Sequence, residues 1–196
     1  MKRVEPPPHP MVIEPASAAH FIAGYKSLLG EVHRQTGGKA RMEVLKMLAS
    51  ARAAVNTNPA LMNAAAASLE GSGQAVPPDV LQAANSLRLK QWIFLRDTTA
   101  YSIFIEPEGT EAYAVLGLTN RIRDIVGGSA LAIKTGVVEY RDRYVCDGIV
   151  ESLVWLGSNL KKEFNATLSL VRKKGQLHVL TEEPRPRVKS TDRYGY

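Results

Sequence analysis

The pattern of apolar residues changes near Gln91, and this change limits the folds open to the chain more than any other feature. Before Gln91, apolar residues recur at helical spacing. After it, they form short segments rich in β-branched and aromatic residues: WIFLRD, YSIFIEP, EAYAVLGL, SALAIKTGVVEY and RYVCDGIVESLVWL. Segments of this kind, separated by turn residues, are typical of β-strands. The sequence therefore predicts a helical region at residues 17–90 and a β-unit from residue 91.

Four helices are predicted in the helical region. The first covers residues 17–36, with Ser17 as N-cap and a glycine pair at its end. The others cover residues 40–55, 59–69 and 78–89. The second and fourth have apolar residues on one face, and the third is alanine-rich and begins with the Asn58–Pro59 signal.

The β-unit is expected to curl. The Arg141–Asp142 turn is predicted to pair the last two strand segments, and Gly136 and Gly148 lie inside them. A glycine within a strand usually marks a bulge or a sharp bend. A helix from about residue 158 to 175 and a short strand at 177–180 follow. The helix carries Lys161, Lys162, Arg172, Lys173 and Lys174, and we interpret the cations near its C-terminal end as favourable to its dipole.

The predicted fold class is α+β. A four-helix region packs on a small, bent antiparallel sheet or partly open barrel of about five strands, followed by a C-terminal helix, because both layers must bury an apolar face. Residues 17–182 are expected to form one compact domain, with the helical region at 17–90 and the β-unit plus helix at 91–182. A proline-rich arm at 1–16 and a basic tail at 183–196 flank it.

Composition narrows the class of protein. The chain has 196 residues, 45% of them hydrophobic and 22% charged, which is ordinary for a globular protein. No apolar run is long enough to span a membrane, and no secretory signal is recognisable. The single cysteine excludes an internal disulfide, and we expect a cytoplasmic protein.

Few residues are arranged for chemistry. The four histidines lack metal-ligand spacing, and neither a phosphate-binding loop nor a cofactor motif is present, so no metal and no cofactor are predicted. Cys146 and Asp147 are the candidate reactive pair, with His178 as the only plausible distant base. Adjacent residues of a strand point to opposite faces, which favours a core cysteine and a bulge aspartate over an active site.

Charge raises a nucleic-acid hypothesis. The net charge is +6, and residues 184–196 contribute +3 of it. Aromatic residues of the β-unit, such as Trp92, Phe94 and Phe104, would stack bases if they were exposed, although most are expected in the core. The candidate phosphate contacts are Arg96, Arg121, Arg123, Arg141 and Arg143.

Residues 85–180 also resemble a known group of sequences. The matching features are LKQWIFLRD, VLGL, the RYVCDGIV hairpin and KKEFNATLSLVRKKG. The chain is similar in these to a group of uncharacterised bacterial proteins with a helical N-terminal half and a compact β-unit carrying an xDG[IL]V hairpin. The resemblance implies this fold and a bacterial or phage origin, and it implies no catalytic residue.

The leading functional hypothesis is a non-catalytic interaction or adaptor protein that binds a protein partner partly through its terminal arms, because such arms commonly become ordered on a partner. No membrane or small-molecule partner is indicated. Candidate partner-binding residues are Met11, Val12, Ile13, Arg185, Arg187, Lys189 and Arg193. The alternative is a nucleic-acid-binding module that uses the β-unit and the basic tail, as an accessory of a mobile-element or defence system. An enzyme centred on Cys146 and Asp147 is the third hypothesis.

Overall fold

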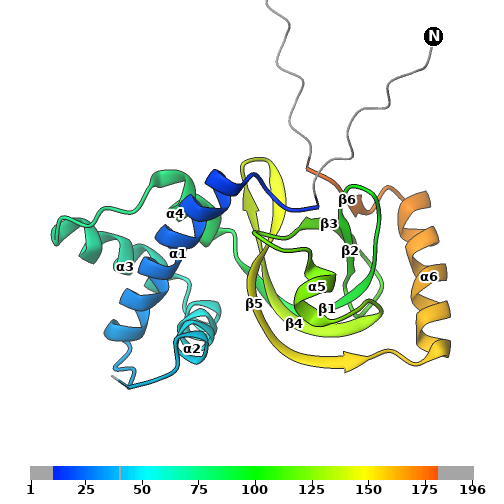
Figure 1. Cartoon of the computed structure of the whole chain (residues 1–196), viewed down its shortest axis with the longest axis horizontal. Helices are drawn as coiled ribbons and strands as arrows, with labels where there is room; N and C mark the ends of the chain where they lie inside the picture. The colour runs from blue at the N-terminus through cyan, green and yellow to red at the C-terminus, as the bar shows by residue number, and fades with distance from the viewer. Residues whose placement is uncertain (1–10, 40, 181–196) are drawn as a thin grey trace, which may run out of the picture.

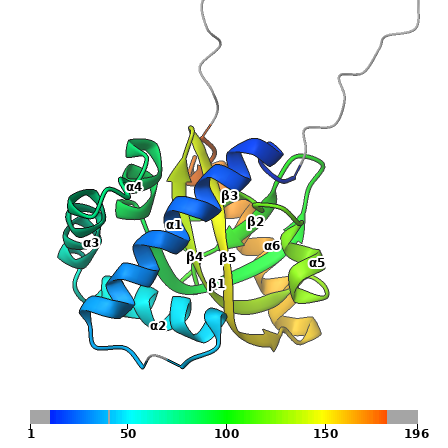
Figure 2. The ribbon, with the colours of Figure 1, turned by 60° about the vertical axis from the view of Figure 1, so that its left-hand side comes forward.

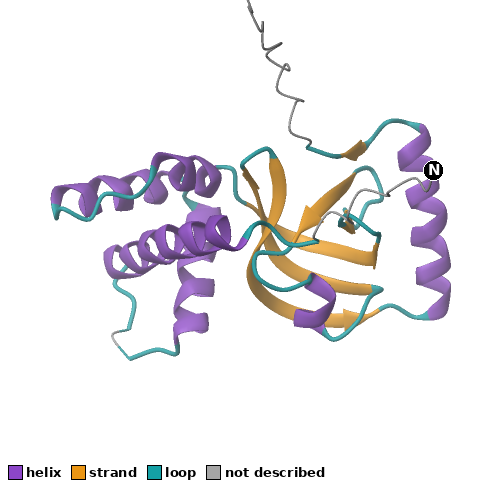
Figure 3. Ribbon diagram, turned by 45° about the horizontal axis from the view of Figure 1, so that its top comes forward, coloured by secondary structure: helices purple, strands orange, loops and turns teal. Residues whose placement is uncertain are grey.

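The structure, a computed structural model, describes residues 11–39 and 41–180. It confirms the α+β class: four helices lie on one side of a curved sheet and a single long helix lies on the other (Figure 1). The helical and strand layers are also distinct in Figure 3. The change of pattern at Gln91 therefore reports a true change of layer, although the first strand already begins at Arg88.

The predicted helices are all present, with shifted ends. They are α1 (Pro15–Gln35), α2 (Val44–Thr57), α3 (Ala60–Gly71) and α4 (Pro78–Asn85). Ser17 is not the N-cap of the first helix. The Glu14 carboxylate accepts hydrogen bonds from the backbone N–H groups of Ala16 and Ser17, at 3.1 and 2.9 Å, and Pro15 occupies the first turn.

Five strands close into a ring in the order β2-β1-β4-β5-β3, because β2 also pairs with β3. A sixth short strand extends the edge of β3. The elements are β1 (Arg88–Asp97), β2 (Ser102–Ile105), β3 (Ala112–Leu116), α5 (Ile122–Val126), β4 (Leu131–Tyr140), β5 (Arg143–Trp155), α6 (Ser158–Lys173) and β6 (Leu177–His178).

The sheet is mixed, which corrects the expectation of an antiparallel one. β3 pairs in parallel with β5 and, further along the same strand, with β6. The chain crosses from β3 through α5 before it forms the β4–β5 hairpin, and a crossover of this kind lets two strands run in the same direction. The sequence pattern marks strands but carries no direction, so this pairing was not predictable.

The turn that pairs β4 with β5 and the bulge that bends them were both predicted. Arg141 and Asp142 both have positive φ, +49° and +55°, as a tight β-hairpin requires. The β4–β5 register shifts between Thr135 and Val137, where β5 carries extra residues around Gly148. Gly148 has a φ of +79°, so the bulge uses a conformation that glycine adopts without strain.

Three apolar clusters hold the layers together. Inside the ring, Trp92, Phe94, Phe104 and Tyr113 are buried, which confirms the expectation that most of these aromatics build the core. The second cluster joins the outer face of β4 and β5 to the N-terminal helices, and α1 crosses these strands in Figure 2. The third joins the outer face of β1 and β2 to α6.

The end of the proline-rich arm belongs to the body of the molecule. Met11 and Ile13 are buried, and Val12 forms an isolated bridge with Gly117. The backbone N–H of Ile13 donates to the Gly117 carbonyl at 3.0 Å. These three candidate partner-binding residues are therefore already engaged within the chain.

Candidate functional site

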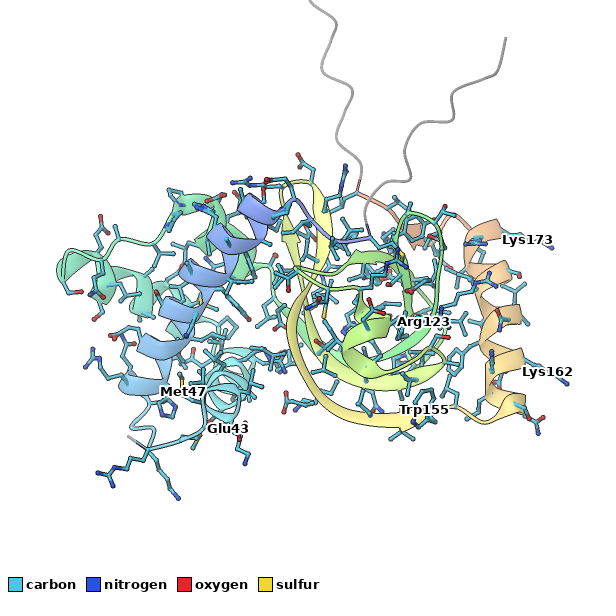
Figure 4. The ribbon with its side chains drawn as sticks, viewed as in Figure 1. Glu43, Met47, Arg123, Trp155, Lys162 and Lys173 are labelled. Atoms are coloured by element: carbon cyan, nitrogen blue, oxygen red, sulfur yellow. The ribbon has the colours of Figure 1, made fainter. Side chains whose placement is uncertain are left out.

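Helix α6 presents its charged face to solvent. Leu168 and Val171 are buried against β1 and β2, and Phe164 packs beside them. The five cations named above, from Lys161 to Lys174, are all exposed, and none forms an ion pair with a residue that the structure describes. Figure 4 shows Lys162 and Lys173 projecting away from the ring.

The excess charge of the body is concentrated on this helix. Residues 158–174 contain five cations and one carboxylate, a net charge of +4. In the remaining described residues, 14 lysines and arginines balance 14 aspartates and glutamates. Several of those cations form ion pairs, namely Arg34, Lys46, Arg52, Arg88, Lys90, Lys134 and Arg141. Outside α6, the described surface is therefore neutral on balance.

The predicted phosphate contacts do not form one cluster. Arg121 and Arg123 lie at the start of α5, and Arg96 lies on β1, all three exposed. Arg141 and Arg143 lie at the β4–β5 hairpin, on the wall of a pocket. The candidates predicted from the sequence lie on separate elements, and the α6 cations had been assigned only to the helix dipole. The signal that would have identified α6 is its own charge imbalance.

The pocket at the hairpin has a volume of about 580 Å³. Its lining comes from both ends of the described chain, including Val12 and Leu180, and from Ala114 and Leu116 on the outer face of β3. Arg141 donates to Ser17 Oγ and, at 3.3 Å, to Asp79 Oδ2. Arg143 donates to the Leu180 carbonyl at 3.3 Å. The arginines of this pocket are thus held by groups of the chain itself.

Asp147 anchors the helical region to the ring. The Nη1 group of Arg52 on α2 donates to both carboxylate oxygens of Asp147, at 2.9 and 2.8 Å. Its Nη2 group donates to Glu151 Oε2 at 2.6 Å. Both members of the Arg52–Asp147 pair are buried. Burial raises the pKa of Asp147, and the guanidinium of Arg52 and the backbone N–H of Ile149 oppose that rise.

Cys146 faces the interior of the ring, opposite to Asp147, as the alternation along a strand predicted. Burial, followed by the nearby Asp147 carboxylate, raises the pKa of its thiol to about 11. A nucleophilic cysteine needs its thiolate form near neutral pH. His178 instead stacks on Tyr113 and lies 3.6 Å from Glu111. The burial and the raised pKa of Cys146 therefore favour a packing role for Cys146 and Asp147 over the enzyme hypothesis.

Metal sites, membrane spans and the predicted tail contacts are the remaining features to locate. Within the described residues there is no cluster of three or more side chains suited to hold a metal ion, and no helix with the length and apolar character to cross a membrane. The tail candidates Arg185, Arg187, Lys189 and Arg193 lie outside the described residues.

Comparisons of the chain with protein-family models, with curated proteins and with solved structures found no match.

Proposed function

We propose that this protein binds nucleic acid and that the exposed face of α6 contacts the phosphates. The observation that carries the proposal is the +4 charge of residues 158–174 on a body that is otherwise balanced. Phosphate binding by lysine and arginine releases condensed counterions, and this term supplies essentially all of the affinity of sequence-independent nucleic-acid binding. A basic face on one side of a domain is the expected electrostatic signature.

The arrangement of the ring gives secondary support. A β1–β2–β3 meander, a helix between the third and fourth strands, and a fifth strand beside the third are features shared with OB-folds, five-stranded Greek-key barrels that bind oligonucleotides. This is an analogy at the level of the fold, which does not by itself imply a function. It agrees with the argument from charge without replacing it.

The test compares two charge-reversal variants of the full chain in a fluorescence-anisotropy titration with a labelled oligothymidylate. Lys162→Glu/Lys173→Glu reverses one charge near each end of the exposed α6 face, and Lys26→Glu/Lys39→Glu makes the same change of charge on and after α1. All four lysines are exposed. Because only the first pair lies on the proposed surface, we expect it to weaken binding at least tenfold and the second to change it less than twofold.

Two results would overturn this proposal. One is equal weakening by both variants, which would mean that only the total charge matters. The other is no binding by the unmodified protein at low salt, to single strands or to duplex. Circular dichroism of both double variants checks that the helices are retained.

A protein partner at the hairpin pocket is a second candidate function, because the pocket is lined from both ends of the described chain. A partner seated there would meet the two terminal segments where they join the body. In a pull-down, removal of residues 1–10 and 183–196 from the chain should then reduce capture of the partner. Met11 and Ile13 are retained in the shortened chain because they are part of the core. Unchanged capture would contradict a role for the arms.

A further inference from the structure

One of the two tryptophans is exposed at the junction between the ring and α6. Trp155, the last residue of β5, has 62% of its surface exposed, whereas Trp92 inside the ring is fully buried. A large aromatic side chain in water loses the free energy that its burial would provide. Packing in the core therefore does not explain why a tryptophan occupies position 155.

The backbone around Trp155 is fixed. Trp155 pairs with Leu131 of β4, and the backbone N–H of Leu156 donates to the Ala130 carbonyl at 2.9 Å. The indole lies against the turn that follows α5, where a Cβ added to Gly128 would be 2.5 Å from its outermost ring carbon. One part of the ring system thus rests on a glycine while the remainder is open to solvent.

Cations lie along the chain on either side of this tryptophan. Arg121 is the N-cap of α5 and Arg123 lies on it, just before the turn that the indole contacts. α6 begins three residues after Trp155 and carries Lys161 and Lys162 in its first turns. Figure 4 shows Trp155 at the end of the molecule where α6 begins. An exposed aromatic ring between two basic elements, α5 and α6, matches the combination of stacking residue and cations that proteins use for unpaired bases.

We infer that Trp155 stacks on a base of a single-stranded nucleic acid whose phosphates run onto α6. This inference rests on the proposed function and adds the class of nucleic acid. In duplex nucleic acid the faces of the bases are already stacked on each other, so an exposed indole offers little to it. The most buried apolar residues of α6, Leu168 and Val171, pack against the ring, whereas Leu160 and Leu170 are exposed. The lysines and arginines around the indole favour a polyanion over a membrane, and anionic vesicles serve below as the competing probe.

The test uses the fluorescence of the full chain. Trp92 is shielded, so quenching by a titrated oligothymidylate reports Trp155. We expect the oligothymidylate to quench the exposed emission and to bind more tightly than a duplex of equal length. Trp155→Ala should weaken single-strand binding about fivefold or more, which is the lower end of the range for loss of one base stack. Trp155→Phe should retain most of the affinity.

Gly128→Ala provides a variant that keeps both the indole and every charge. The added methyl group would collide with the indole of Trp155, so the indole must move. We expect a loss of affinity between those of Trp155→Phe and Trp155→Ala, with an unchanged dependence on salt.

The outcomes separate this inference from the proposed function. If Lys162→Glu/Lys173→Glu weakens binding while Trp155→Ala does not, α6 is the interface and the stacking role is wrong. Duplex binding as tight as single-strand binding would also overturn the inference. So would a blue shift of the exposed emission with anionic phospholipid vesicles but not with oligothymidylate. If no nucleic acid binds, both proposals fail.

Discussion

Arg52 and Asp147 show how one residue pair joins two layers of different structure. The guanidinium comes from α2 and the carboxylate from the bulge of β5, and both are buried. Removal of one member of a buried pair leaves the other charge without compensation, which costs more than the pair itself contributes. The pair therefore ties α2 to β5, and the loss of either member should be costly.

Arg52→Met is expected to lower the free energy of unfolding by about 3–5 kcal/mol, measured by urea denaturation. The double variant Arg52→Met/Asp147→Asn should be more stable than Arg52→Met alone, because it removes the uncompensated carboxylate. A cost below about 1 kcal/mol for the single variant, or a still less stable double variant, would contradict this view of the interface.

The thiol of Cys146 is expected to be unreactive in the folded protein. Its pKa is raised to about 11 by burial, so near pH 8 it is protonated as well as shielded. A thiol reagent at pH 8 should modify it slowly in buffer and within seconds in denaturing urea. Rapid modification of the native protein would mean that the ring opens readily or that the thiolate is stabilised.

At this scale the sequence predicted part of the candidate site. Alternation along a strand was enough to place Cys146 and Asp147 on opposite faces. It could not identify Arg52 as the partner of Asp147, because 95 residues separate the two and only the tertiary fold brings them together. The sequence pattern also could not show whether Trp155 is exposed.

Among the elements, the β4–β5 hairpin depends on the backbone of Gly148. A Cβ there would meet only Leu118 Cδ1, at 3.5 Å, so there is room for a methyl group. The φ of +79° is instead the obstacle, and Gly148→Ala should cost about 1–2 kcal/mol of stability. The control Gly30→Ala lies within α1, where an added Cβ meets no atom within 4 Å, and should instead raise stability by about 0.5–1 kcal/mol. Similar thermal denaturation midpoints for the two variants would contradict the role given to the bulge.

Most elements follow from local pattern, and their arrangement does not. Apolar spacing and turn residues such as Arg141 and Asp142 predicted the helices, the five main strands and the final hairpin. The parallel pairing of β3 with β5 depends on where α5 carries the chain, which no local signal encodes. The cap of α1 was assigned to Ser17 because serine is a common N-cap, but the carboxylate of Glu14 lies where it reaches two backbone N–H groups.

For the whole molecule, the decisive property is the separation of charge between α6 and the remainder. If three to five cations of α6 contact phosphates, the logarithm of the binding constant should fall with the logarithm of salt concentration with a slope of roughly −2 to −3.5 for a single strand. Lys162→Glu/Lys173→Glu should reduce the magnitude of that slope by at least about 1.4, and Lys26→Glu/Lys39→Glu should not change it. A slope near zero in the unmodified protein would exclude phosphate contacts as the source of affinity.

The most direct test of the account is lysine footprinting of the full chain by acetylation and mass spectrometry, with and without a saturating oligothymidylate. The account predicts that Lys161, Lys162, Lys173 and Lys174 become protected, while Lys26 and Lys39 are modified at the same rate in both samples. Protection spread evenly over these six lysines, or confined to Lys26 and Lys39, would contradict an interface on α6.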